Sequence, residues 1–138
     1  MAAYFRAQGV RTILDFGFTK SLPLQEVRPL HDYALEVQEK HGDVVFGHWL
    51  QIDPRLGEAG AAELRRCIEA SRGFVSYCVS AAGMGFAAND PAYDPFYRVC
   101  LEHGRPVLVL VGYTGAGAGM PGGDGVDLEL DAELRLRG

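Results

Sequence analysis

Four short apolar runs, centred roughly 30 residues apart, are the feature that most constrains the fold of this chain. They occupy residues 10–17, 44–50, 73–78 and 106–111. Each run is rich in β-branched and aromatic residues, is bounded by turn formers, and has the composition of a strand that is buried on both faces. Because parallel strands need a long crossover connection between them, this spacing predicts alternating strands and helices.

The segments between the runs carry apolar residues at helical spacing. The three stripes consist of Val27, Leu30, Ala34 and Val37, of Ala61, Leu64 and Ile68, and of Phe96, Val99 and Cys100. A short amphipathic stretch at residues 1–8 predicts a further helix ahead of the first strand. Gly42 and Gly104 stand where two of the helices should end, and Asp90 and Pro91 where the last should begin. The predicted order is αβαβαβαβ, and the fold class is α/β.

Chain length limits how many of these units fit. A closed eight-stranded β/α barrel needs roughly 250 residues, whereas this chain has 138 residues and a mass of 15.0 kDa. Four β/α units with a parallel sheet fit into residues 1–125 as one domain. In residues 126–138 apolar and acidic residues alternate, which predicts either an edge strand or a frayed tail.

Composition and charge limit the kinds of partner that we expect for this chain. The chain is 48% hydrophobic and 22% charged, as in soluble globular proteins, and its net charge of -5 disfavours nucleic acid and anionic membranes. It has no apolar run of roughly 20 residues and no secretion signal, so we expect a cytoplasmic protein. Three widely spaced cysteines, Cys67, Cys78 and Cys100, predict reduced thiols in or near the core.

A glycine-rich segment, residues 112–125, follows the last predicted strand. Gly117, Gly119 and Gly122 have the G-x-G-x-x-G spacing of a dinucleotide-binding turn. That motif requires a helix to begin within it, and Pro121 with its neighbouring glycines prevents one. The segment therefore predicts a mobile loop of the kind found at active sites.

The candidate site residues lie where the predicted strands end, because ligands of parallel α/β sheets bind at the carboxyl ends of the strands. They are Asp15, His48, Tyr77 and Tyr113. Asp15, within an apolar run, is either a polar contact for a neighbour or a site residue. His48 has the chemistry of a metal ligand or a general base.

The other histidines, His31, His41 and His103, fall on or at the ends of predicted helices, where a solvated face or the helix dipole explains them. No two histidines have the H-x-H or H-x-x-x-H spacing that presents two imidazoles to one ion. No cysteine stands beside a histidine, and there is no Walker lysine or G-x-S-x-G nucleophile motif.

Three stretches resemble one known family. They are NDPAYDPFYRVCLEHGRPVLVLVGYTGAGAGMPGG at residues 89–123, GHWLQIDP at 47–54 and AAYFRAQGVRTIL at 2–14. They resemble the amidohydrolase-related superfamily, in its branch of metal-dependent hydrolases and decarboxylases, over nearly the whole chain. The resemblance implies a β/α barrel with a divalent metal, zinc or manganese, at the carboxyl ends of the strands. It also implies hydrolysis or decarboxylation of small, often aromatic, carboxylic substrates.

The residues depart from that family at its metal ligands. Leu110 stands where the family has a histidine in P-V-L-x-H-T-G, and Val75 and Tyr77 stand at the polar positions of G-F-K-x-H. The family's opening H-x-H strand and its later histidine and aspartate segments are not in this sequence. Leucine cannot coordinate a metal, so we expect no cofactor and no cluster of three or four ligands in this chain. A divalent metal is expected only if its ligands come from elsewhere.

Two functions from different classes fit these observations. The first is a truncated or accessory half-barrel that lacks the family metal centre and acts with a second copy or a partner chain. The second is an enzyme, a hydrolase or a decarboxylase/lyase, that acts on a small carboxylic or aromatic substrate. In the second case Asp15, His48, Tyr77 and Tyr113 supply acid/base and hydrogen-bonding groups. A fragment of a longer enzyme is a related possibility.

Overall fold

The structure, a computed structural model, describes residues 2–15 and 22–110. In chain order its elements are α1 (Ala2–Gln8), β1 (Thr12–Asp15), α2 (Leu24–His41), β2 (Val45–Leu50), the 3-10 helix η2 (Pro54–Leu56), α3 (Gly57–Ala70), β3 (Phe74–Ser80), α4 (Ala81–Met84), the 3-10 helix η3 (Pro91–Tyr93), α5 (Asp94–Glu102) and β4 (Leu108–Leu110). The predicted alternation of helices and strands is confirmed, and α4 and the two 3-10 helices are additions to it. The predicted glycine loop, Tyr113, the domain boundary at residue 125 and the tail lie outside the described residues.

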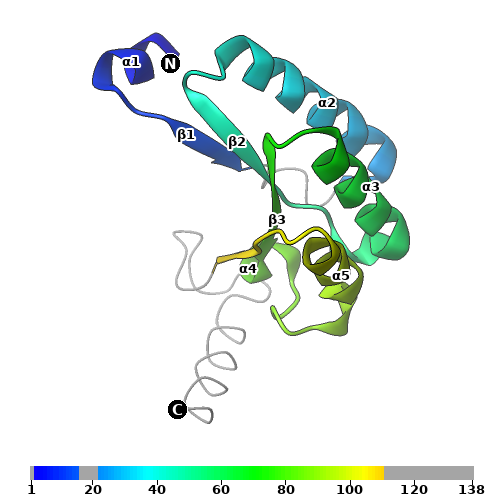
Figure 1. Ribbon diagram of the computed structural model, residues 1–138. Helices are drawn as coiled ribbons and strands as arrows, with labels where there is room; N and C mark the ends of the chain where they lie inside the picture. Colours follow the sequence, from blue (N-terminus) through cyan, green and yellow to red (C-terminus); the bar gives the residue numbers. More distant parts are fainter. Residues whose placement is uncertain (1, 16–21, 111–138) are drawn as a thin grey trace, which may run out of the picture.

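The four strands form one parallel sheet in the order β1-β2-β3-β4, which is the order of the chain. The sheet is curled, and α2, α3 and α5 follow one another along one side of it (Figure 1). A doubly wound sheet reverses its strand order and carries helices on both faces, whereas a β/α barrel keeps the order and the side. The predicted α/β half-barrel is therefore confirmed.

The two end strands are more exposed than the sequence indicates. Ile13 of β1 is 39% exposed and Val109 of β4 is 37% exposed, while β2 and β3 are mostly buried. The expectation that all four strands are buried on both faces is wrong for β1 and β4, because within the described residues each of them pairs with a single neighbouring strand.

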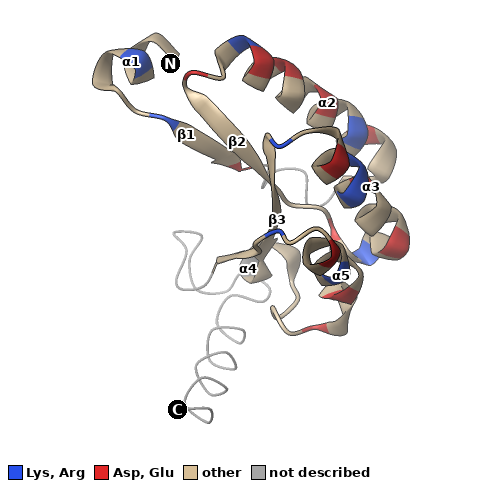
Figure 2. Cartoon of the chain, viewed as in Figure 1, with Lys and Arg blue, Asp and Glu red and all other residues tan. Residues whose placement is uncertain are grey.

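The core lies between the sheet and the helices, and aromatic side chains fill the part of it between β3 and α5. Tyr77 of β3 stacks on Phe96 of α5 with ring centroids 4.7 Å apart, and Tyr93 packs against Tyr77. The three cysteines are free and buried, as predicted. Most of the Lys, Arg, Asp and Glu residues lie on the helices, and the strands carry few of them (Figure 2), as expected for amphipathic crossover helices that cover a sheet.

Helix ends follow the predicted signals in part. The Asp90 carboxylate accepts a hydrogen bond of 2.8 Å from the Ala92 amide, so Asp90 caps η3, which runs directly into α5. Gly104, just after α5, has φ of +59°, the left-handed conformation that glycine adopts most readily. Among the described helices, none is long and apolar enough to cross a membrane.

Candidate functional site

Asp15 ends β1 and lies on the open face of the sheet. Its neighbour Leu14 lines a groove with Val37 of α2, and because side chains alternate along a strand, Asp15 points away from that helix. Both carboxylate oxygens of Asp15 accept hydrogen bonds from Nε2 of Gln51, at 2.8 and 2.9 Å. Gln51 follows β2 directly, so the pair bridges the carboxyl ends of two neighbouring strands.

Cys78 of β3 extends this polar group to a third strand. Burial and then the negative charge of Asp15 raise the pKa of its thiol to about 12, against a lowering effect of its hydrogen bond with Gln51. The thiol is therefore protonated at neutral pH and is a poor nucleophile. Sequence reasoning selected Asp15 and missed Gln51, although a polar residue directly after a strand was the available signal.

His48 of β2 lies on the opposite face, in the layer between the sheet and α2. It is fully buried, its ring centroid is 6.2 Å from that of Phe74, and the backbone of Ala34 on α2 hydrogen-bonds it. Burial lowers the pKa of the imidazole, and the nearby His31 lowers it further. A neutral imidazole packed beneath a helix belongs to the core of the half-barrel.

Tyr77 is also held in the core. Its hydroxyl donates a hydrogen bond of 2.6 Å to the carbonyl oxygen of Ile52, its ring stacks on Phe96, and burial raises the pKa of the phenol. The structure thus gives Asp15, His48 and Tyr77 three separate sets of partners. Tyr113 lies outside the described residues.

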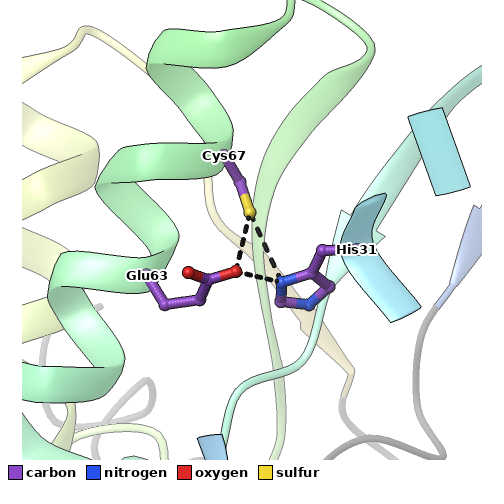
Figure 3. A group of neighbouring side chains, drawn as sticks. All are labelled: His31, Glu63 and Cys67. Carbon is purple, nitrogen blue, oxygen red and sulfur yellow. Dashed lines mark hydrogen bonds and ion pairs between the residues drawn. The ribbon is translucent and has the colours of Figure 1, made fainter. Parts of the chain in front are cut away.

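A second polar group lies on the helix side, between α2 and α3. His31 of α2 meets Glu63 and Cys67 of α3 (Figure 3). Nδ1 of His31 is 2.9 Å from Oε1 of Glu63 and 3.3 Å from Sγ of Cys67, and the thiol is 3.4 Å from the same carboxylate oxygen. All three side chains are buried. Among the described residues this is the group of three whose possible metal-ligand atoms lie within 4.8 Å of one another.

Two sequence-based expectations are wrong at this point. His31 does not lie on a solvated helix face, and three ligand-type side chains do form a cluster. The sequence alone does not reveal this cluster, because His31 and Glu63 are far apart along the chain. Their helices become neighbours because the strands that they connect pair in the sheet. The available signal was Glu63 and Cys67 on one face of a helix, one turn apart, next to the apolar stripe. His103, in contrast, caps α5 and bonds Glu69, as a histidine at a helix end should.

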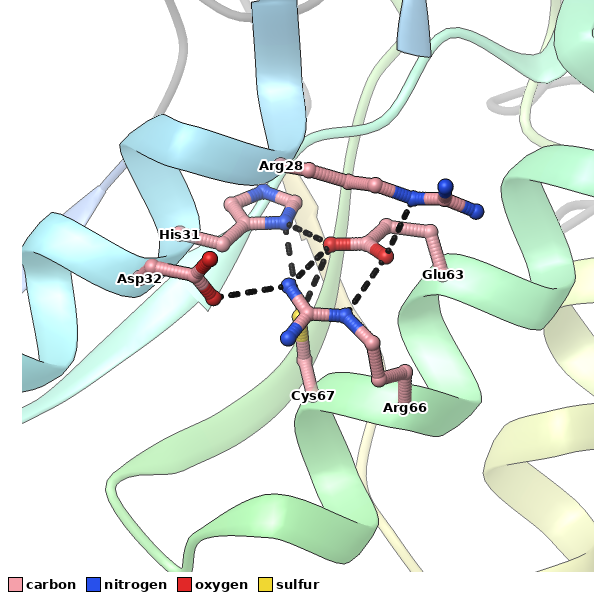
Figure 4. A network of polar contacts seen from close by, with 6 residues as sticks. All are labelled: Arg28, His31, Asp32, Glu63, Arg66 and Cys67. Carbon is pink, nitrogen blue, oxygen red and sulfur yellow. Dashed lines mark hydrogen bonds and ion pairs between the residues drawn. The ribbon is translucent and has the colours of Figure 1, made fainter. Parts of the chain in front are cut away.

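Arginines surround the carboxylate of this cluster (Figure 4). Arg66 bonds both oxygens of Glu63 at 2.8 Å, and Nε of Arg28 lies 3.2 Å from Oε2. Burial opposes ionisation of Glu63, but the hydrogen bonds from Arg66 and His31 outweigh it and lower the pKa to about 2. A third hydrogen bond of Arg66, 3.0 Å long, joins α3 to Asp32 of α2.

The cluster does not have the geometry of a cysteine nucleophile. A catalytic imidazole uses one ring nitrogen for the thiol and the other for the orienting carboxylate. Here the same Nδ1 atom of His31 faces both groups, and burial followed by the charge of Glu63 raises the pKa of the Cys67 thiol. The thiol is protonated and shielded from substrates.

Comparison with known proteins identifies the family. The family model described as amidohydrolase matches residues 11–134, which is most of the chain. The chain belongs to the amidohydrolase family. No curated protein matches it. The resemblance of the three stretches to the amidohydrolase-related superfamily is therefore confirmed.

The described carboxyl edge of this amidohydrolase chain does not fit the divalent metal that the family resemblance implies. Its donors include the Asp15 carboxylate, which Gln51 already bonds, and the protonated Cys78 thiol. On β4, Leu110 offers only a hydrocarbon side chain, 36% exposed. Structural and catalytic zinc sites take at least three protein ligands of the N, O or S type. Among the described residues, no three His, Cys, Asp or Glu ligand atoms converge at this edge.

Proposed function

We propose that this amidohydrolase-family chain supplies one half of a β/α barrel without the family metal centre, and that a second copy supplies the other half. The observation that supports this proposal is the open sheet. Within the described residues β1 pairs with β2 alone and β4 with β3 alone, so each end strand has one unpaired edge. Unpaired parallel edges are templates for pairing with another chain.

Exposed apolar side chains on the end strands support the same proposal. Ile13 on β1 is 39% exposed, and Val109 and Leu110 on β4 are 37% and 36% exposed. Apolar surface of this kind on a sheet edge favours association or aggregation, because its burial is favourable by about 25 cal/mol per Å². A partner that adds parallel strands at both edges would remove it from water.

A two-fold axis along the barrel would pair the open edges of β1 and β4 at the same time. In this arrangement β4 of each copy pairs in parallel with β1 of the other, and eight strands close the sheet. Both copies then present the carboxyl ends of their strands at the same mouth. Each copy brings Asp15, held by Gln51, to that mouth.

The mass of the chain in solution tests the proposal. Size-exclusion chromatography with light scattering should give twice the 15.0 kDa of one chain. The variant Val109→Lys places a charge on the β4 edge and should give monomers, whereas Leu101→Lys, at an 82% exposed position of α5, should remain dimeric. A wild-type monomer, or a larger mass only with another protein bound, contradicts pairing between copies.

A second candidate function is enzymatic, and the Asp15–Gln51 pair is the observation that favours it. A carboxylate that is held by an amide at the carboxyl edge is positioned to accept a proton or to bind a hydroxyl or amine of a substrate. Family membership supports a small carboxylic or aromatic substrate, with hydrolysis or decarboxylation as the reaction.

An assay on small aromatic carboxylic acids and their amides tests this candidate. Asp15→Asn should lower turnover by about 100-fold or more, as expected for loss of a general base, and Asp43→Asn on the surface should leave it unchanged. Equal activity of the wild-type chain and Asp15→Asn contradicts a role for Asp15. Absence of turnover in the wild-type dimer leaves the half-barrel proposal standing and removes the enzymatic one.

A further inference from the structure

We propose that His31, Glu63 and Cys67 form a binding site for a soft divalent cation, with Zn²⁺ as the expected ion. The site lies between α2 and α3, on the helix side of the sheet, and is separate from the carboxyl edge. Its role is to fasten the two helices together. The inference does not depend on pairing between copies, because all three side chains belong to one chain.

The three donors match the ligand preference of zinc. Zinc is bound in proteins by imidazole nitrogen, thiolate sulfur and carboxylate oxygen, and the sulfur selects against hard cations such as Mg²⁺ and Ca²⁺. Here one atom of each type converges: Nδ1 of His31, Sγ of Cys67 and Oε1 of Glu63. Their separations are 2.9, 3.3 and 3.4 Å. Metal bonds of about 2.0 to 2.3 Å at tetrahedral angles place such ligands about 3.4 to 3.6 Å apart, so the atoms need to open by a few tenths of an ångström.

The surroundings orient the carboxylate for this purpose. Oε2 of Glu63 faces Nε of both Arg28 and Arg66, at 3.2 and 2.8 Å, while Oε1 faces the imidazole and the thiol. Hydrogen bonds that fix the second oxygen hold a metal-binding carboxylate in place. Glu63 and Cys67 are one helical turn apart, so α3 presents both to the same point.

Binding must displace one arginine contact and one proton. Nη2 of Arg66 lies 2.8 Å from Oε1, and it has to leave that oxygen when an ion arrives, keeping its bond of 3.0 Å to Asp32. The thiol of Cys67 loses its proton to solvent and becomes the thiolate ligand. The thiolate adds a second negative charge beside the Glu63 carboxylate, whose other oxygen stays near Arg28. The arginine side chains are 54% and 42% exposed, so an ion reaches the buried ligands by passing them.

Titration of the chelator-treated full chain with Co²⁺ and Zn²⁺ tests the proposal. Co²⁺ should give a thiolate-to-metal charge-transfer band and tetrahedral d–d bands at one ion per chain, and Zn²⁺ should remove them. Cys67→Ser and His31→Gln should weaken binding by about 100-fold or more, while the matched control Cys100→Ser, another buried thiol, should bind as the wild type does.

These measurements separate a metal site from an ion network that only joins the helices. Absence of the charge-transfer band in the folded wild-type chain overturns the proposal without any variant. A band that persists in Cys67→Ser also overturns it. Light scattering on the same samples separates this result from the half-barrel proposal, because zinc binding should leave the mass unchanged.

Discussion

Nδ1 of His31 lies 2.9 Å from Oε1 of Glu63, and both side chains are buried between α2 and α3. Burying a carboxylate is unfavourable unless charges and hydrogen bonds compensate it. Arg66 supplies both, and it also bonds Asp32 on α2. α2 and α3 are therefore joined by a polar contact as well as by apolar packing.

Removal of the Glu63 charge should destabilise this contact. Glu63→Gln keeps the shape of the side chain but leaves Arg66 and Arg28 without their shared anion. We expect the free energy of unfolding to fall by about 2 kcal/mol, as for a lost hydrogen bond to a charged group. Urea denaturation with a chelator present measures it. Glu58→Gln, an exposed ion-pair partner of Arg98 on the same helix, should change it by less than about 0.5 kcal/mol, and equal effects of the two variants would contradict the argument.

His48 should make stability depend on pH. Burial lowers the pKa of its imidazole in the folded chain below the ordinary value of 6.5. The unfolded chain then binds the proton more readily, so the stability contributed by neutral His48 is present above pH 6.5 and is lost as the pH falls below it. The slope for one proton is at most about 1.4 kcal/mol per pH unit. Urea midpoints of the wild type between pH 8 and pH 5 should fall, and His48→Leu should flatten that fall.

His103 provides a control of opposite sign. Its backbone bond to Val99 and its contact with Glu69 raise the pKa of the imidazole in the folded chain. Stability from a raised pKa is present below the unfolded value and is lost as the pH rises above it. His103→Gln should therefore leave the fall below pH 6.5 as steep as in the wild type or steeper. If His103→Gln flattens the fall and His48→Leu does not, His48 is not the residue whose titration causes it.

The alternation of strands and crossover helices could be predicted from the sequence because each of these elements carries a local signal, whereas α4 and the two 3-10 helices were not predicted. Strand-length apolar runs and helical stripes identified every β/α unit, and their spacing predicted a parallel sheet. The barrel-type arrangement was implied by the family resemblance. The exposure of β1 and β4 could not be predicted in this way. Ile13 and Val109 stand in apolar runs like those of the central strands. They are more exposed because β1 and β4 each pair with one described strand, whereas β2 and β3 pair with two.

The site was less predictable, because each side chain's partners lie far away in the sequence. Position at a strand end correctly brought Asp15 to the carboxyl edge. The same rule applied to His48 and Tyr77 did not reveal which face of the sheet each side chain occupies, and both lie among core residues. The cluster of His31 with Cys67 depends on how two helices pack, which no spacing within either helix encodes.

Tyr77→Phe should lower stability. The hydroxyl of Tyr77 donates to the Ile52 carbonyl at 2.6 Å inside the core, so its loss leaves a buried acceptor without that donor. The expected decrease in the free energy of unfolding is about 1 to 2 kcal/mol. Tyr33→Phe, at a position 60% exposed, should cost less than about 0.5 kcal/mol. A Tyr77→Phe variant as stable as the Tyr33→Phe control would indicate that the hydroxyl has a role other than this hydrogen bond.

Gly60→Ala should destabilise α3 although alanine is the better helix former. A Cβ at Gly60 would lie 2.9 Å from Cζ of Phe96 and 2.9 Å from Cβ of Leu56, closer than carbon atoms pack. Overpacking costs about 1 to 3 kcal/mol, whereas helix propensity returns less than about 1 kcal/mol near a helix start, so the net change is a loss of about 1 kcal/mol. A double-mutant cycle with Phe96→Leu, which shortens the opposing side chain, isolates the contact. If the clash is the cause, the double variant is more stable than the sum of the single effects predicts, and additive effects would point to the helix backbone instead.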